Sequence, residues 1–467
     1  MRNFIRIPAL AAVLAAGAPA PAQAPLPPPT GRPLDIDFSA DPVLRLRRAQ
    51  TRYEQFRDAI AAAVEQHPGI TEAAATEDEA MGAVREARSA QRPTVDVTIT
   101  SYRVLSREFS NDPTNIIERS RPEQRTDAIL TAQQTIFDFG ATARRVSAAG
   151  ARLRAAGAEL EQSADAVALN AIGAWYEVFG YRALVALTEA FVASQRELRA
   201  AVEFRIREGA SAEGDLARVD SYIAQAQVRL ARFRRLLATS EARFTELTGA
   251  PPPGDLERAP APGLPVQNRD EAALAAQDAP AVRSAQAVAD ASRQEARAAR
   301  ADRLPQISAG VDAGRYGVFE NERDYDIRGR VALRWRPIGN ADPRADQAVA
   351  RARSAEARAT RIGEEAARDA VIAWSDVRAL EQQLEAVEDA YIASRQSRDV
   401  IAERFRAARG TLFDVVAAED AYFEAATAYI QSLTELDAAR YILLSRTGRL
   451  LEALRIDADR LRGEGER

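Results

Sequence analysis

The fold is decided by a stretch that occurs twice, as AVREARSAQRPTVDVTI at residues 83–99 and as EARAARADRLPQISAGV at residues 295–311. In both copies an Ala/Arg/Glu-rich segment stops at a proline, and a segment of alternating polarity follows. Pro93 and Pro305 lie 212 residues apart. A period of this length is far longer than that of a solenoid, so it indicates one duplicated, domain-sized unit.

The match continues to the end of both copies. Asp215 and Asp414 are equivalent at a separation of 199 residues, and the same separation relates two tryptophans and two Thr-Gly pairs: Trp175 with Trp374, and Thr248-Gly249 with Thr447-Gly448. The sequence therefore predicts two structural repeats separated by a Pro-rich linker and flanked by a leader and a tail. Their expected ranges are 23–56 for the leader, 57–250 and 269–450 for the repeats, 251–268 for the linker and 451–467 for the tail.

Each repeat has the same expected order of elements. A helix stopped by proline is followed by a β-hairpin, a very long helix, a glycine turn and a returning helix that ends at Thr-Gly. The expected ranges are a helix over about 57–91, a hairpin over 94–137 and a helix hairpin over 141–249 in the first repeat, and 269–303, 306–337 and 343–448 in the second. The turns fall at Gly209 and Gly410.

The long helices carry a heptad pattern. The apolar residues of one seam step by 3, 4, 3 and 4: Val377, Leu380, Leu384, Val387 and Tyr391. Such seams pack helix against helix. At ~1.5 Å per residue, helices this long would extend roughly 100 Å, which predicts a coiled coil or a tube.

The composition excludes several classes of chemistry. The chain of 467 residues has no cysteine and one histidine, His67, and all 63 basic residues are arginine. Disulfides, thiolate metal sites, cysteine nucleophiles, histidine metal clusters and Schiff-base or P-loop lysines are therefore absent or nearly so. The net charge of −5 does not suggest nucleic-acid binding. No cofactor, metal or catalytic residue is predicted, and we expect no enzyme.

The first 22 residues have the order of a secretory signal peptide. Arg2 and Arg6 are followed by a short apolar run and by the small residues Ala20-Pro21-Ala22. The run is too short for a membrane anchor, and no later stretch of about 20 apolar residues exists. The Pro-rich segment 25–33 is expected to be an extended leader without a core.

The expected strands separate a membrane protein from an ordinary coiled coil. Val95, Val97 and Ile99 alternate with polar residues, and the strand near 327–336 alternates apolar residues with Arg328, Arg330, Arg334 and Arg336. Each strand has ~10 residues, the length of an outer-membrane strand. Two hairpins on a soluble helical body are the alternative.

The number of strands in one chain determines whether a barrel can close without further copies. Four strands cannot close a barrel in lipid, because open edges leave backbone groups unsatisfied. Three copies would supply twelve strands. The four arginines would then face water in the lumen, since arginine on the lipid face is costly.

Three segments form the hairpin turns and a strand–helix junction: ERFRAARGTLFDVVAAEDAYFEAA at 403–426, EFRIREGASAEGDLARVDSYIAQA at 203–226 and QTIFDFG at 134–140. These segments resemble the TolC family of outer-membrane efflux and secretion ducts. The resemblance implies a mainly α fold with membrane β-structure: a homotrimer whose 12-stranded outer-membrane barrel continues as a periplasmic α-helical barrel. It also implies a passive duct that a periplasmic adaptor (membrane fusion) protein links to an inner-membrane transporter of the RND or ABC type.

The resemblance further implies roles for the hairpin tips. Gate candidates are Asp215, Asp414, Glu419 and Asp420, which threefold symmetry would turn into rings of charge. Adaptor-docking candidates are Arg205, Gly209, Arg404, Arg406, Arg409, Gly410, Thr411 and Leu412. An aspartate near a helix N-terminus also has a purely structural explanation as a cap. The chain departs from the family pattern at Ala407, Leu412 and Ala417, which places the usual tip latch in doubt.

Two other functions stay open from the sequence. One is a periplasmic structural or adaptor coiled coil that never enters the membrane, and the other is an envelope enzyme using carboxylates alone. Within the duct class, the sequence does not separate drug efflux from type I protein secretion.

Overall fold

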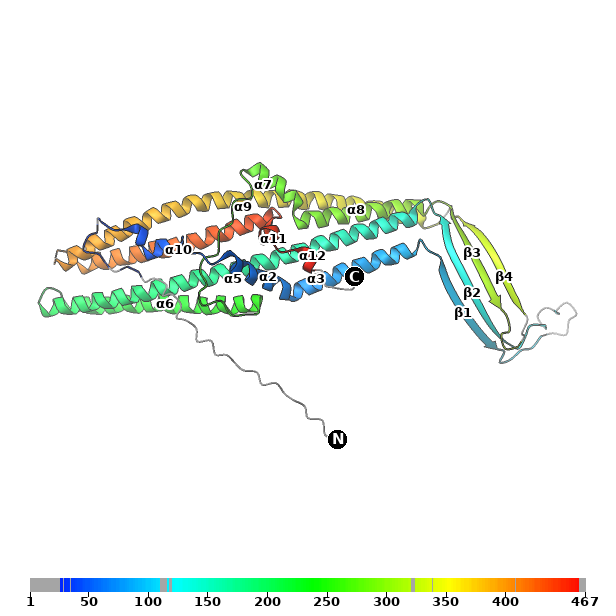
Figure 1. Ribbon diagram of the computed structural model, residues 1–467, viewed down its shortest axis with the longest axis horizontal. Helices are drawn as coiled ribbons and strands as arrows, with labels where there is room; N and C mark the ends of the chain where they lie inside the picture. The colour runs from blue at the N-terminus through cyan, green and yellow to red at the C-terminus, as the bar shows by residue number, and fades with distance from the viewer. Residues whose placement is uncertain are drawn as a thin grey trace, which may run out of the picture.

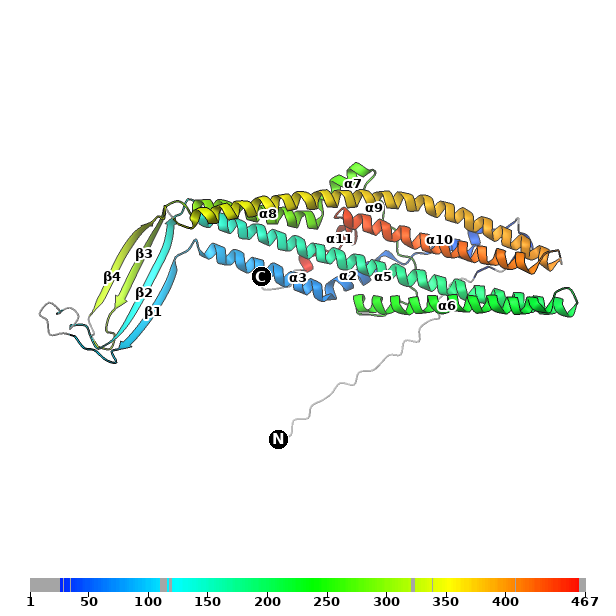
Figure 2. The same cartoon turned by 180° about the vertical axis from the view of Figure 1, so that it is seen from behind.

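The computed structural model describes residues 26–461, apart from residues 28, 34, 110–115, 117–119, 321–323, 338 and 408. The expected signal peptide lies outside the described residues. The protomer is a long bundle of helices with a four-stranded sheet at one end and two hairpin tips at the other (Figure 1; Figure 2 shows the reverse side). The expected mainly α fold with long helices and paired strands is confirmed.

Two helix hairpins make up the bundle. The helices are α5 (Ala141–Arg207), α6 (Glu213–Thr248), α9 (Ala341–Arg406) and α10 (Leu412–Arg446). Their bounds lie within two residues of the expected long helices. At 67 residues, α5 extends about 100 Å. Gly249 and Gly448 follow α6 and α10 in the left-handed conformation, with φ of 71° and 68°, which favours glycine at a helix end.

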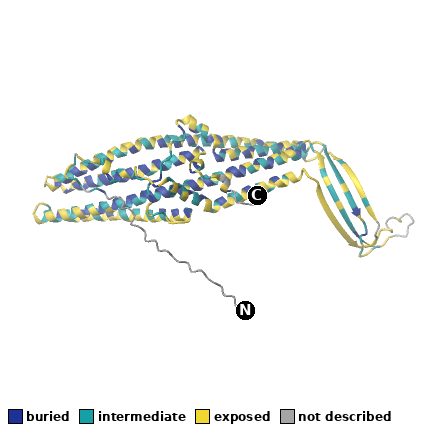
Figure 3. Ribbon diagram, viewed as in Figure 1, coloured by how far each residue is buried: buried dark blue, intermediate teal, exposed yellow. Residues whose placement is uncertain are grey.

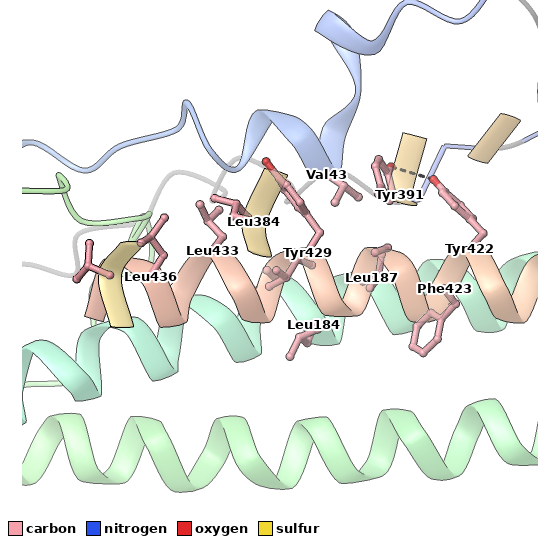
Figure 4. Close-up of a cluster of buried hydrophobic side chains, with 14 of the residues drawn as sticks. Val43, Leu184, Leu187, Leu384, Tyr391, Tyr422, Phe423, Tyr429, Leu433 and Leu436 are labelled. Carbon is pink, nitrogen blue, oxygen red and sulfur yellow. Dashed lines mark hydrogen bonds between the residues drawn. The ribbon is translucent and has the colours of Figure 1, made fainter. Parts of the chain in front are cut away.

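The heptad seam of α9 is buried against α10. Leu384 and Tyr391 pack with Tyr422, Tyr429 and Leu433, and leucines of α5 complete the cluster (Figure 4). Burial of a leucine side chain contributes about 1.5–3 kcal/mol. Packing of these seams therefore stabilises helices whose exposed faces are rich in alanine, arginine and glutamate.

The first helical segment of each repeat is broken, where the sequence predicted one helix over 57–91 and one over 269–303. The structure has α2 (Tyr53–Gln66) and α3 (Pro68–Ser89) in the first repeat, and α7 (Arg269–Ala275), the 3₁₀ turn η3 (Ala276–Asp278) and α8 (Pro280–Ala301) in the second. Pro68 and Pro280 each begin a new helix, because proline has no N–H to continue the preceding one.

The four strands form one antiparallel sheet in the order β1-β2-β3-β4. Their bounds are β1 (Thr94–Arg103), β2 (Gln124–Phe137), β3 (Gln306–Arg315) and β4 (Tyr325–Arg334). The pairing of β2 with β3 joins the two halves of the chain. Residues on the strands are mostly exposed, whereas buried residues concentrate where helices face each other (Figure 3).

The Pro-rich segment 25–33 was expected to have no core, but its Leu26 is buried in the cluster between α5, α9 and α10. Downstream in the leader, Val43 joins the same cluster, and Phe56 packs edge-on to Trp175 at 5.3 Å between ring centroids. Proline prevents regular hydrogen bonding but does not prevent an extended chain from burying side chains and offering carbonyls. The tail also packs: α11 (Leu450–Ala453) and α12 (Ala458–Leu461) bury Leu450 and Leu461 beside α5.

Among the described residues, no helix combines the length and apolar character needed to cross a bilayer.

Candidate membrane face and hairpin tips

One face of the sheet is apolar across all four strands, apart from Gln134 near the helix end and polar residues, including Arg315, near the loop end. The register places residues directly opposite each other on one side, and side chains alternate along each strand. This face carries Val95, Val97, Ile99, Ala128, Leu130, Ala132, Ile307, Ala309, Val311, Ala313, Ile327, Val331 and Leu333. Many of its members are exposed in the protomer, with 70% exposure at Ile99 and 78% at Val331. A continuous exposed apolar face of this kind marks contact with lipid or a partner.

The opposite face is polar and charged. It carries Thr94, Asp96, Thr98, Thr100, Asp127, Thr131, Gln133, Ser308, Asp312, Asp326, Arg328, Arg330 and Arg334. Arg328 pairs with Asp326, and Arg330 lies 3.9 Å from Asp312 across the strands. Arg336 follows β4 and is exposed. The three arginines within β4 therefore share the face opposite the apolar one.

Aromatic side chains lie at both ends of the strands. Phe137, Phe139 and Trp335 lie at the helix end and are exposed, and the two phenylalanine rings are 4.7 Å apart. Tyr102 and Tyr325 lie at the loop end. This distribution is typical of the two interfaces of a membrane.

The sheet has two free edges. β1 pairs only with β2, and β4 pairs only with β3, among the described strands. Exposed edges present unpaired N–H and C=O groups to any further strand. A neighbouring copy can therefore extend the sheet on both sides.

Both hairpin tips are built by helix caps. At the first tip the carboxylate of Asp215, in the first turn of α6, accepts a hydrogen bond from the Ala212 N–H at 3.3 Å. At the second tip Thr411 and Asp414 cap each other reciprocally, with Asp414 N–H to Thr411 Oγ1 at 3.2 Å and Thr411 N–H to Asp414 Oδ2 at 3.3 Å. Capping thus accounts for both aspartates locally, while they keep access to solvent.

Arg205 joins the two tips. Its guanidinium donates to the Phe405 carbonyl oxygen at 3.1 Å and lies 4.4 Å from the Phe405 ring centroid. Beside it, apolar side chains of all four long helices form a small cluster that includes Val202, Val219 and Val415. Among the docking candidates, Arg205 therefore contacts the other tip and stabilises the packing of the two tips.

Leu412 was expected to be exposed, and the structure corrects this. As the first residue of α10 it packs into the tip cluster, while neighbouring Phe413 is 63% exposed. Arg404, Arg406 and Arg409 remain exposed around the turn, as does Gly209, whose φ is 74°. Gly410 is half-buried and Thr411 is exposed. The tip thus presents arginines and Phe413 to solvent.

The four gate candidates differ in exposure and in ion pairing. Asp215 and Asp414 retain solvent access, and Asp420 pairs with Arg229 of α6 at 3.2 Å. Glu419 is only 5% exposed and lies 3.6 Å from Arg398. Burial raises the pKa of Glu419 above its usual value, although the positive charge of Arg398 opposes this. Glu419 therefore belongs to the interior of the protomer and presents no charge to a lumen.

We expect Glu419→Gln to keep or raise the melting temperature at pH 7. The raised pKa means that the folded state binds a proton at Glu419 more tightly than the unfolded state does, so this group lowers stability as pH rises above about 4.5. The gain of the variant should shrink as pH falls towards 4.5. Glu424→Gln, at an exposed position on the same helix, is the matched control. A large loss of melting temperature in Glu419→Gln at pH 7 would contradict the argument.

Sequence reasoning missed a buried charge cluster on α9. Arg395, Arg398 and Asp399 are all buried, and Arg395 pairs with Asp41 of the leader. The signal was present in the seam, since Tyr391, Arg395 and Arg398 continue its steps of 4 and 3. Charges at seam positions indicate buried ion pairs, but the partner of Arg395 lies 354 residues away in the sequence.

The comparisons with known proteins agree with this architecture. The profile of the family described as "Outer membrane efflux protein" matches residues 59–250, which include the first strands and the first long hairpin. The fold is shared with VceC of Vibrio cholerae, with a TM-score of 0.75 at 18% identity, over 85% of this chain and 97% of that one. The first repeat of this chain therefore matches the outer membrane efflux protein family, and the whole chain shares the fold of a solved outer membrane protein.

Further similar proteins cover most of this chain. The outer membrane efflux protein BepC of Brucella suis is 24% identical over 341 residues, which are 69% of this chain and 72% of BepC. The open-state MtrE outer membrane channel of Neisseria gonorrhoeae has a TM-score of 0.69 at 18% identity, over 85% of this chain and 89% of that one. The fold of this chain is thus the fold of solved outer membrane channels.

Proposed function

We propose that this protein is the outer-membrane export duct of a tripartite efflux pump or type I secretion system. The observation that carries the proposal is the sheet: one apolar face, one face with arginines, and two free edges, placed at the end of helices about 100 Å long. An apolar face suits lipid and a charged face suits a water-filled lumen.

Closure of the sheet requires further copies. Twelve strands from a homotrimer would satisfy both edges of every protomer, with repeats 57–250 and 269–450 each contributing two strands and one helix hairpin. The long helices of three protomers would then continue the barrel as a tube into the periplasm. The duct would carry out no catalysis, and the energy would come from the inner-membrane transporter.

The tips are the proposed gate and docking surface. Threefold symmetry would make Asp215 and Asp414 rings of three negative charges, with Asp420 further along α10. Exposed Arg404, Arg406, Arg409 and Phe413 would meet a periplasmic adaptor protein. Aromatic and arginine side chains are the residue types enriched at the centre of protein interfaces.

The first experiment is the detergent-corrected mass of the mature protein extracted from outer membranes, by light scattering. We expect three chains per particle and, after reconstitution in planar bilayers, cation-preferring conductance. A stable monomer in the outer membrane, or a species released without detergent, would overturn the duct and favour a periplasmic coiled-coil protein.

A further inference from the structure

The described polar contacts of the leader with the long helices involve one helix hairpin only. We call residues 26–49 the strap; it contains the short helices η1 (Phe38–Ala40) and α1 (Pro42–Arg45) and lies beside the tip half of α9 and α10 (Figure 1, dark blue). All hydrogen bonds and ion pairs described between the strap and the long helices go to α9. One of these contacts is the ion pair between Arg47 and Glu388 at 2.8 Å. The α5–α6 hairpin has no such polar link to the strap among the described residues.

Asp41 is the central contact of the strap. It is 1% exposed, pairs with Arg395 and accepts a hydrogen bond from the Tyr391 hydroxyl at 2.9 Å. The Tyr391 hydroxyl also lies 3.1 Å from that of Tyr422, which extends the network to α10 (Figure 4). The same carboxylate caps α1 by accepting from the Val43 N–H at 2.8 Å. One side chain therefore folds the strap locally and fastens it to the hairpin.

A second set of contacts reaches towards the tip. Arg398 donates to the Pro27 carbonyl at 3.0 Å, and the Thr30 N–H donates to Asp399 at 3.3 Å. Arg406, in the last turn of α9, donates to the Pro29 carbonyl at 3.3 Å. The strap thus covers α9 as far as the helix end that meets Arg205 of the other hairpin.

The opposite end of the strap is anchored to the linker between the repeats. The Thr51 N–H donates to the Arg258 carbonyl at 2.9 Å, and the Glu257 N–H donates to the Thr51 hydroxyl at 3.0 Å. Arg258 in turn pairs with buried Asp437 of α10 at 2.7 Å. The strap therefore connects the middle of the molecule to the tip.

The buried charged side chains of α9 beneath the strap do not all have hydrogen-bond partners. Nε of Arg395 is buried without a hydrogen-bond partner, whereas Nε of Arg398 and Oδ1 of Asp399 form a buried ion pair at 2.6 Å. A buried polar group without a hydrogen-bond partner lowers the stability of the fold, and hydration of that group removes the penalty. Departure of the strap would hydrate the Arg395 guanidinium, which offsets part of the cost of breaking the strap's hydrogen bonds and makes release accessible.

We infer that the strap is a releasable clamp that holds the tip half of α9 in place and sets how readily the α9–α10 hairpin moves away from α5–α6. The inference rests on the proposed function for its effect on the gate. The clamp itself is a property of the protomer.

The absence of lysine allows a direct test of release. Asp35→Lys places a single lysine at an exposed strap position followed by isoleucine, so a lysine-specific protease has one cleavage site in the whole chain. Cleavage requires the strap to detach from α9, so the cleavage rate reports how often the strap detaches. In this background we expect Asp41→Asn to accelerate cleavage about tenfold or more. Asp37→Asn, at an exposed residue that caps η1, is the matched control with an unchanged rate.

Circular dichroism of each variant establishes that the helices remain folded, and bilayer recordings on the same proteins test the effect on the gate. We expect a higher open probability with Asp41→Asn than with Asp37→Asn. Equal cleavage rates would overturn the clamp, and faster cleavage with unchanged open probability would overturn its effect on the gate. Absence of conductance in the unaltered protein, with the cleavage difference intact, would overturn the proposed duct and leave the clamp supported.

Discussion

Arginine in place of Val97 will prevent assembly in the outer membrane, whereas arginine in place of the adjacent Thr98 will not. Val97 lies in a row with Leu130, Ala313 and Ile327 on the apolar face. Arginine near the middle of the lipid face costs about 2–4 kcal/mol, and a trimer would carry three copies.

The measurement is the amount of protein in purified outer membranes that runs as a heat-sensitive oligomer. Thr98 is one residue away on the same exposed strand, so it matches Val97 in strand context and differs in face. Equal assembly of the two arginine variants would contradict the assignment of the apolar face to lipid. Loss of both would show that β1 tolerates no arginine on either side.

Alanine in place of Asp437 will lower the free energy of unfolding by about 3–5 kcal/mol, because it leaves the Arg258 guanidinium buried and unpaired. The two side chains form a bidentate pair, and their exposed fractions are 6% and 0%. The pair ties the linker between the repeats to the middle of α10.

Thermal or denaturant unfolding followed by helix content checks this prediction. Glu365→Ala is the matched control, since Glu365 forms an exposed i,i+4 pair with Arg361 on α9. We expect that control to cost at most about 0.5 kcal/mol. The double variant Arg258→Met/Asp437→Leu should recover much of the loss, because it removes both charges together. A small loss in Asp437→Ala would show that water reaches Arg258 once the carboxylate is gone.

The long helices and the strands were predictable because their signals are local. The steps of 3 and 4 through Leu384 and Tyr391 require only a helix with one buried seam, and the alternation at Val95, Val97 and Ile99 requires only a strand with two different faces. Both patterns can be read within a dozen residues. The breaks at Pro68 and Pro280 were also readable in principle, since proline is best placed in the first turn of a helix.

Whether an individual residue near the tip is buried or exposed was not predictable from such local patterns. Leu412 and Phe413 are neighbours at a turn, and only the placement of α10 against α5, α6 and α9 buries the first and exposes the second. Glu419 differs from Asp420 by one position on α10, which rotates one carboxylate into the protomer beside Arg398 and leaves the other at the surface with Arg229.

By itself, the sequence determined the long helix hairpins and the strand faces, because each rests on spacing along a continuous segment. Only the tertiary structure decided that the leader is a packed strap, that Asp41 meets Arg395, and that Arg205 joins the two tips. The physical reason is distance along the chain: Asp41 and Arg395 are 354 residues apart. Their pairing depends on how whole helices pack, and no local periodicity encodes it.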